Sequence, residues 1–184
     1  MNEKEKMLSG QLYDACADEK LKQERIKCKL LCSKFNNTTY DDFKTKNEII
    51  REILGKTKKN FLIEPYFWCD YGYNIEIGEN FYSNHNLVIL DPAKVTFGDN
   101  VFIGPNCGFY TANHPLDPTE RNKGLETAKP IIVGNNVWVG ADVTVLAGVS
   151  IGDNCTIGAG SVVTKDIPNN SLAIGNPCKV VRKI

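Results

Sequence analysis

The stretch Val133–Val163 reads in blocks of six: Val133-Gly-Asn-Asn-Val-Trp, Val139-Gly-Ala-Asp-Val-Thr, Val145-Leu-Ala-Gly-Val-Ser, Ile151-Gly-Asp-Asn-Cys-Thr, Ile157-Gly-Ala-Gly-Ser-Val, then Val163. A β-branched aliphatic residue opens every block, and glycine follows it in four of them. A period of six belongs neither to an α-helix nor to simple strand alternation. It is typical of a parallel β-helix, in which each block forms a short strand and a corner.

In such a solenoid the opening aliphatic residue points inward and stacks on its equivalents in neighbouring coils, which lie roughly 4.8 Å apart. Corners require compact residues with positive φ, and both glycine and asparagine supply this at little cost. The same frame runs from Ile77 to Ile89 and from Phe97 to Phe109, with a slip of two residues near Asp91-Pro92. The aromatic-rich segment Phe61–Tyr73 is expected to begin the first coil.

Residues 1–56 are rich in lysine and glutamate and are predicted to form a helical cap on a β-helix of residues 57–184. One helix is expected over Met7–Cys16. A second begins after Asp18 and ends at Asn36-Asn37. A third follows the capping-box pattern Thr39-x-x-Asp42 and stops at Gly55. A unit this small and thinly apolar is expected to dock on the solenoid.

Charge and hydropathy exclude several classes of protein. Lysine plus arginine number 22 and aspartate plus glutamate number 22, and no basic stripe appears, which argues against a nucleic-acid partner. No run of 18 apolar residues occurs, so we expect no membrane span. The charged start Met1-Asn-Glu-Lys-Glu-Lys lacks the apolar core of a signal peptide, which favours a cytoplasmic protein.

Seven cysteines are scattered along the chain without a C-x-x-C motif, and Cys28 and Cys32 lie four residues apart on the second expected helix. We interpret them as small apolar core residues in a reducing cytosol. The alternative is a zinc site or a disulfide framework.

The repeat breaks over residues 111–130, a polar excursion with three prolines. A long irregular loop on a regular solenoid favours a functional role. His114 lies at its start and is the best candidate for a general base near neutral pH. The other histidine, His85, lies inside a repeat and is interpreted as a corner residue. Trp138 is either an outward shelf for a ligand or a contact with a neighbouring chain.

Five segments together resemble the bacterial hexapeptide-repeat sugar O-acetyltransferases: Leu8-Ser-Gly-Gln-Leu-Tyr-Asp-Ala, Cys69-Asp-Tyr-Gly-Tyr-Asn-Ile, Phe81-Tyr-Ser-Asn-His-Asn, Thr111-Ala-Asn-His-Pro-Leu-Asp-Pro and Gly175-Asn-Pro-Cys-Lys-Val-Val-Arg. The resemblance covers essentially the whole chain. It implies a left-handed parallel β-helix that uses acetyl-CoA, needs no metal, and forms a homotrimer with active sites between subunits. Asp70 and Pro92 replace a serine and an aspartate of the galactoside branch, which favours the maltose or glucose branch.

The resemblance also implies roles for individual residues. His114 matches the catalytic base, and Asn84 matches a position near the acetyl group that could stabilise an oxyanion. Acceptor-binding positions are matched by Asp14, Asp70, Tyr82 and Glu126. The coenzyme A groove is matched by Trp138, Gly140, Ala159, Thr164, Lys165, Lys179 and Arg182, with the cations near its phosphates.

Alternative functions differ in what they require. The same fold could acetylate another small acceptor, such as a galactoside, a xenobiotic alcohol or serine. A solenoid carbonic anhydrase would need three zinc-binding histidines between chains, and this chain has only two histidines. A purely structural solenoid would not explain an irregular excursion that carries a histidine.

Overall fold

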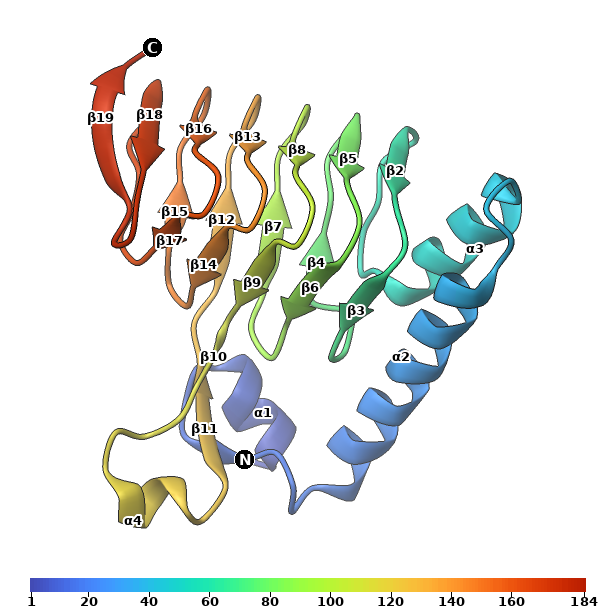
Figure 1. Ribbon diagram of the computed structural model, residues 1–184. Helices are drawn as coiled ribbons and strands as arrows, with labels where there is room; N and C mark the ends of the chain where they lie inside the picture. Colours follow the sequence, from blue (N-terminus) through green and yellow to red (C-terminus); the bar gives the residue numbers. More distant parts are fainter.

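The computed structural model describes residues 1–184 and forms a parallel β-helix whose first coil is covered by helices (Figure 1). Three faces are formed by parallel strands, and the chain passes from face 1 to face 2 to face 3 in each coil. Face 1 contains β2 (Phe61–Ile63), β5 (Phe81–Ser83), β8 (Phe102–Ile103), β13 (Trp138–Val139), β16 (Thr156–Ile157) and β18 (Ser171–Ile174), and ends with the antiparallel β19 (Lys179–Lys183).

The other two faces follow the same order of coils. Face 2 contains β3 (Phe67–Cys69), β6 (Leu87–Leu90), β9 (Gly108–Tyr110), β14 (Thr144–Leu146) and β17 (Val162–Val163). Face 3 contains β4 (Ile75–Glu76), β7 (Val95–Phe97), β12 (Ile131–Val133) and β15 (Ser150–Ile151). The predicted parallel β-helix with an N-terminal helical cap is confirmed.

The interior follows the six-residue frame. All the opening residues of the blocks are buried, namely Val133, Val139, Val145, Ile151, Ile157 and Val163. In the earlier coils the interior is aromatic, with the Phe97 ring centroid 5.1 Å from that of Phe81 and 5.0 Å from that of Phe109. Edge-to-face contacts of this kind add to the hydrophobic gain of burying large rings.

Coil length explains the slip in the sequence frame. Tyr82 pairs with Phe102, 20 residues later, whereas Trp138 pairs with Thr156, 18 residues later. The two additional residues of the earlier coils lie between faces 2 and 3, where the slip at Asp91-Pro92 was predicted. We call this corner edge 2–3, and name the other two edge 3–1 and edge 1–2 in the same way.

Asparagine and glycine have different tasks at the corners, a distinction that the sequence reading did not make. Positive φ is supplied mainly by asparagine, and along edge 3–1 the residues are Asn80, Asn100, Asn136, Asn154 and Asn170. The glycine that follows each opening aliphatic residue is needed for close approach between coils instead. A Cβ on Gly140 would lie 2.7 Å from the backbone nitrogen of Ala159 in the next coil.

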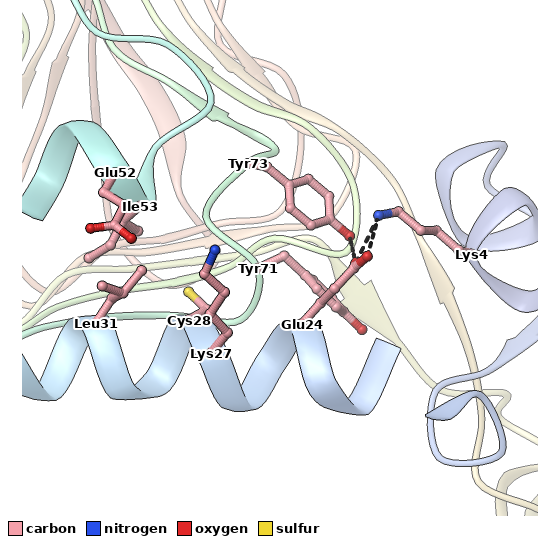
Figure 2. A pocket seen from close by; sticks show the side chains of 9 residues that line it. All are labelled: Lys4, Glu24, Lys27, Cys28, Leu31, Glu52, Ile53, Tyr71 and Tyr73. Atoms are coloured by element: carbon pink, nitrogen blue, oxygen red, sulfur yellow. Dashed lines mark hydrogen bonds and ion pairs between the residues drawn. The ribbon is translucent and has the colours of Figure 1, made fainter. Parts of the chain in front are cut away.

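The helical cap comprises α1 (Glu3–Leu8), α2 (Glu19–Asn37) and α3 (Phe43–Ile53). Apolar residues of α2 and α3 continue the core of the β-helix, whereas Met7 of α1 belongs to a second, smaller cluster. Glu24 on α2 links α1 to the first coil, because it pairs with Lys4 at 2.7 Å and accepts a hydrogen bond from Tyr73 at 2.9 Å (Figure 2). None of the helices has the length and apolar character needed to cross a bilayer. The division into domains 1–56 and 57–184 stays a prediction.

Two details of the cap differ from the sequence expectations. The helix expected over Met7–Cys16 is wrong, because α1 ends at Leu8, Gly10 has φ +73°, and Tyr13–Asp14 forms the strand β1. The third helix does form, but its N-cap is Asp42, whose carboxylate accepts the Thr45 N–H at 3.0 Å, and not Thr39.

The excursion leaves the prism after β9 and carries β10 (Ala112–Asn113), the short helix α4 (Pro118–Arg121) and β11 (Leu125–Ala128) (Figure 1). β11 lies between β10 and β1, and both pairings are antiparallel. The N-terminal segment therefore supports the base of the excursion from more than a hundred residues away. At the other end, β19 pairs antiparallel with β18.

Candidate active site

His114 lies directly after β10, at the root of the excursion. Its Nδ1 is 2.9 Å from the carbonyl oxygen of Leu125 on β11. Because a carbonyl oxygen can only accept, Nδ1 must carry the hydrogen, and the neutral ring then has its free lone pair on Nε2. The side chain is exposed. The backbone therefore fixes both the tautomer and the orientation of a ring whose basic nitrogen is accessible.

Two of the predicted acceptor-binding residues lie on the same small sheet as His114. Glu126 follows Leu125 and accepts a hydrogen bond from the Tyr13 hydroxyl at 2.6 Å. Burial and this bond raise the pKa of Tyr13. Asp14 pairs with Leu125 in the strand register, and its Oδ1 accepts the N–H groups of Cys16 and Ala17 at 2.8 Å each. The sheet β1–β11–β10 thus carries both carboxylates, with the imidazole at the end of its third strand.

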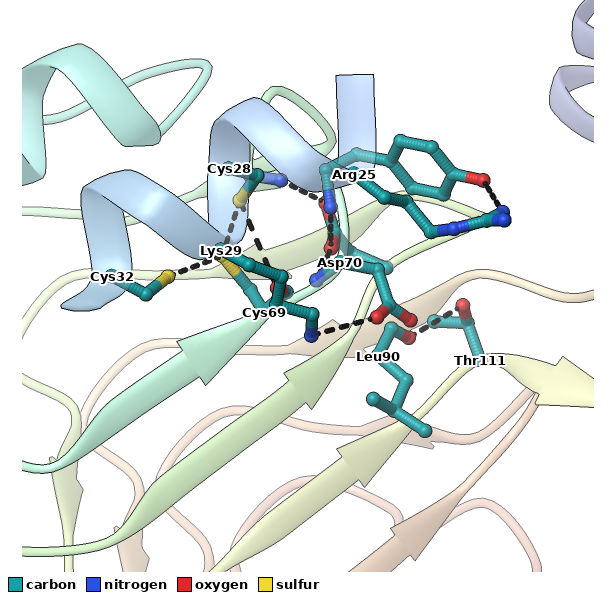
Figure 3. A network of polar contacts seen from close by, with 11 residues as sticks. Arg25, Cys28, Lys29, Cys32, Cys69, Asp70, Leu90 and Thr111 are labelled. Atoms are coloured by element: carbon teal, nitrogen blue, oxygen red, sulfur yellow. Dashed lines mark hydrogen bonds and ion pairs between the residues drawn. The ribbon is translucent and has the colours of Figure 1, made fainter. Parts of the chain in front are cut away.

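Asp70 lies on edge 2–3, the corner from which the excursion also departs. Its carboxylate pairs with Lys29 of α2 at 3.0 Å (Figure 3). Its backbone N–H donates to the buried Asp91, which also accepts the N–H of Tyr71 at 2.9 Å and of Gly72 at 2.7 Å. Desolvation outweighs these hydrogen bonds and raises the pKa of Asp91 to about 6.

Asn84 and Tyr82 lie elsewhere on the prism. Tyr82 belongs to β5 on face 1, and Asn84 follows that strand at edge 1–2. The Asn84 Oδ1 accepts the His85 N–H at 2.7 Å, whereas its Nδ2 has no hydrogen-bond partner within the chain. Desolvation raises the pKa of Tyr82. Edge 1–2 and edge 2–3 are separated by the width of face 2, which is roughly 15 Å for about five strand residues. A single chain therefore does not bring Asn84 to His114.

The residues predicted to bind coenzyme A fall into three groups. Trp138, Gly140 and Ala159 lie on face 1 and edge 1–2 of adjoining coils, and Trp138 is 59% exposed beside Phe102, itself 48% exposed. Lys179 and Arg182 are exposed on β19, which continues face 1. Thr164 and Lys165 are also exposed, but they follow β17 at edge 2–3. Gly140 itself is required by packing against the next coil.

Residues 6–58 match the maltose acetyltransferase hexapeptide capping motif, and residues 130–165 match the bacterial transferase hexapeptide of six repeats. A protein of Saccharomyces cerevisiae named as an acetyltransferase is 54% identical over 98% of this chain and 92% of its own length.

Two solved structures of acetyltransferases are similar to this chain over its whole length. A maltose O-acetyltransferase from Clostridium difficile 630 has a TM-score of 0.98 at 50% identity and covers 100% of this chain and 98% of its own. The chain belongs to the hexapeptide-repeat acetyltransferase family. This acetyltransferase is also similar to a galactoside acetyltransferase in complex with coenzyme A, with a TM-score of 0.96 at 42% identity, covering 100% of this chain and 92% of the other.

Two neighbours of the candidate site in this acetyltransferase, Tyr13 and Lys29, could not be selected from the sequence. Tyr13 supports Glu126, and Lys29 pairs with Asp70. Asp91, the carboxylate beside proline where the frame slips, organises the turn after β3. The carbonyl of Leu125 left no signal in the sequence, since any residue could supply it.

Proposed function

We propose that this acetyltransferase transfers the acetyl group of acetyl-CoA to a hydroxyl of maltose, glucose or a related sugar. The sugar class is supported by the similarity to the Clostridium difficile maltose O-acetyltransferase. The donor is supported by the coenzyme A complex of the galactoside enzyme, and by a 35% identical Vibrio cholerae hexapeptide-repeat acetyltransferase complexed with acetyl coenzyme A.

The contact between His114 and Leu125 carries the proposal that His114 is the general base. With Nδ1–H held by the carbonyl, Nε2 accepts the proton of the sugar hydroxyl while the hydroxyl oxygen attacks the thioester carbon. The tetrahedral intermediate then collapses, the carbon–sulfur bond breaks, and the imidazolium returns its proton to the departing thiolate. No covalent acyl-enzyme is needed.

Asn84 is proposed to donate its free Nδ2 hydrogens to the oxyanion of the tetrahedral intermediate. A pre-positioned donor of this kind acts where charge develops, and removing one costs about 10²–10³-fold in rate. Hydrogen bonds from sugar hydroxyls are proposed to reach the acceptor residues Asp14, Asp70, Tyr82 and Glu126. For Asp70 the neighbouring Lys29 holds the carboxylate in place.

The coenzyme is proposed to lie along face 1, where Trp138 offers an apolar shelf. Gly140 and Ala159 allow its pantetheine arm to approach the backbone, and Lys179 and Arg182 on β19 are proposed to contact its phosphates, because cations favour multiply charged groups. Thr164 and Lys165 lie at edge 2–3 and are proposed to reach a coenzyme bound on face 1 of a neighbouring chain. We expect the reaction to take place in the reducing cytoplasm, in keeping with seven free thiols.

A homotrimer is proposed because Asn84 and His114 lie at different edges of one prism. If the excursion of one chain reaches face 1 of the next, both residues face the same cleft. Leu116, near the tip of the excursion, is 94% exposed. Burying this side chain against a neighbouring copy would be favourable, which supports docking of the excursion there.

The proposal is tested by measuring acetyl-CoA turnover with maltose, glucose and a thiogalactoside side by side. His114→Ala is expected to lower turnover by at least about 10²-fold while leaving assembly and coenzyme A binding intact. His85→Ala, which removes the chain's other histidine, is the matched control and should retain turnover. Near-full activity of His114→Ala would refute its role, and absence of turnover with every sugar would refute the acceptor class.

A further inference from the structure

Three thiols meet where the helical cap joins the β-helix. Cys28 and Cys32 lie one turn apart on the inner face of α2, and Cys69 is the last residue of β3 (Figure 3). The Cys69 sulfur is 3.4 Å from that of Cys28 and 3.8 Å from that of Cys32. All three sulfur atoms lie within 4.8 Å of one another.

The cluster differs from the other buried cysteines of this chain. Cys107 and Cys155 are isolated, and each thiol donates to a backbone carbonyl, to Gly140 at 3.1 Å and to Pro168 at 3.2 Å. They are core residues whose small polar group is satisfied locally. The three clustered thiols also face one another, although Cys28 Sγ additionally contacts the Cys69 carbonyl oxygen at 3.7 Å. The exposed fractions of Cys28, Cys32 and Cys69 are 3%, 0% and 0%.

The sulfur geometry matches a metal site. With zinc–sulfur bonds of about 2.3 Å, sulfur atoms of one coordination sphere lie about 3.8 Å apart in tetrahedral geometry and about 4.0 Å apart in trigonal geometry. The observed separations require only small side-chain adjustments. We propose that Cys28, Cys32 and Cys69 bind one thiophilic cation, zinc or cuprous copper, as three thiolate ligands. Thiolate sulfur is the ligand type that selects these ions.

A route of entry is present. Cys28 lines a pocket of about 300 Å³ between the cap helices and the first coil, together with Lys27, Leu31, Ile53 and Tyr71 (Figure 2). An ion or a small fourth ligand, such as water, can reach the cluster through this pocket. Each coordinated thiol releases its proton to solvent, and the positive charge of the ion compensates the thiolates.

The site would stabilise the junction of cap and solenoid rather than take part in acetyl transfer. It links α2 to β3, and Cys69 directly precedes Asp70, whose carboxylate pairs with Lys29 of α2. The expectation that the reaction needs no metal is therefore separate from this proposal. Under this proposal Cys28, Cys32 and Cys69 are metal ligands as well as core residues.

The test uses the full chain, purified with a reductant and a chelator and then titrated with Zn²⁺ or with Cu⁺. Competition against a zinc-selective and a copper(I)-selective indicator distinguishes the two ions, and Co²⁺ reports thiolate ligands by its charge-transfer absorption. We expect one ion per chain and a higher temperature of thermal unfolding with metal, because an ion that binds only the folded state stabilises it.

Cys32→Ser should weaken binding by more than about 100-fold, as changes merely behind metal ligands already cost about 10- to 100-fold. Cys107→Ser removes an isolated buried thiol and is the matched control, expected to bind as the original chain does. The proposal is overturned by an original chain that binds neither ion and shows no thermal shift, or by equal binding in Cys32→Ser. The proposal is also overturned if protein denatured without a reductant contains only five free thiols, because the sequence has seven cysteines and the loss of two thiols would indicate a disulfide.

Discussion

Edge 3–1 and edge 2–3 of the prism both turn the chain from one face to the next, but edge 3–1 repeats the same corner in every coil and edge 2–3 does not. Along edge 3–1 every coil uses an asparagine at φ 55–57°, and the side-chain amides hydrogen-bond from coil to coil at 2.9–3.0 Å. We call this set, Asn80, Asn100, Asn136, Asn154 and Asn170, the asparagine ladder. Along edge 2–3 the turn after β3, the turn after β6 and the excursion after β9 all differ.

This difference indicates that the repeated corners of edge 3–1 stabilise the fold, whereas the irregular corners of edge 2–3 can hold functional groups. A repeated corner satisfies its polar groups with its own equivalents, so it offers no free donor or acceptor to a ligand. Edge 2–3 instead carries Asp70, the buried Asp91 and the excursion with His114. Function on this solenoid is expected where corner groups are not paired with their equivalents in the next coil, as along edge 2–3 and at Asn84 on edge 1–2.

The largest expected effect is on Asn84, an asparagine outside the ladder whose amide nitrogen is unpartnered. Asn84→Ala should lower turnover by about 10²–10³-fold, the usual loss for one oxyanion donor. Coenzyme A affinity by calorimetry and thermal unfolding should be unchanged. If the turnover of Asn84→Ala stayed within a few-fold of that of the original chain, Asn84 would serve only the conformation of the corner and not the reaction.

The second prediction concerns the buried charge of edge 2–3. The folded-state pKa of Asp91 is raised from 3.8 to about 6, so the folded chain binds a proton that the unfolded chain releases. Its contribution to stability is therefore present at low pH and is lost as pH rises through about 6. We expect the difference in unfolding free energy between the original chain and Asp91→Asn to fall by up to about 3 kcal/mol as pH rises from about 4 to about 7.

Denaturant titrations over this pH range measure that difference directly. Asp91→Asn is the appropriate reference because it keeps the shape but cannot titrate. A difference that is constant with pH would show that the three N–H donors, rather than desolvation, control this carboxyl.

The repeated parts of the molecule were predictable from sequence, and the irregular parts were predictable only in position. The buried aliphatic residues from Val133 to Val163 follow directly from the six-residue frame, because each coil repeats the environment of the last. The strand Tyr13–Asp14 was mistaken for helix because its partner, β11, lies 111 or more residues away. Local pattern carries no information about such a pairing.

The candidate site shows the same limit. His114 could be selected by its place at the start of the excursion, but the Leu125 carbonyl that orients it could not. Likewise the spacing of Cys28 and Cys32 was visible, whereas the approach of Cys69 depends on how α2 docks on β3. The sequence therefore indicated which residues could be reactive, whereas the contacts that orient them or bring them together were seen only in the fold.

The smallest expected effect is on the asparagine ladder. Asn136→Ala should lower the free energy of unfolding by about 2 kcal/mol, since alanine is strained at positive φ and two ladder hydrogen bonds are lost. Asn136→Gly relieves the strain and should lower it by about 1 kcal/mol. Turnover should be preserved in both, measured below their unfolding temperatures. A loss of turnover comparable to that of Asn84→Ala would remove the distinction between the two kinds of corner.

The central claim is that Asn84 of one chain and His114 of another complete a single active site, and mixing two inactive variants tests it most directly. His114→Ala and Asn84→Ala chains are co-expressed at equal levels, and acetyl-CoA turnover of the mixed assemblies is compared with that of each variant alone. Random assembly of trimers gives one intact pair in every mixed trimer, so about a quarter of the original turnover is predicted. Turnover no higher than that of the separate variants would contradict a shared site.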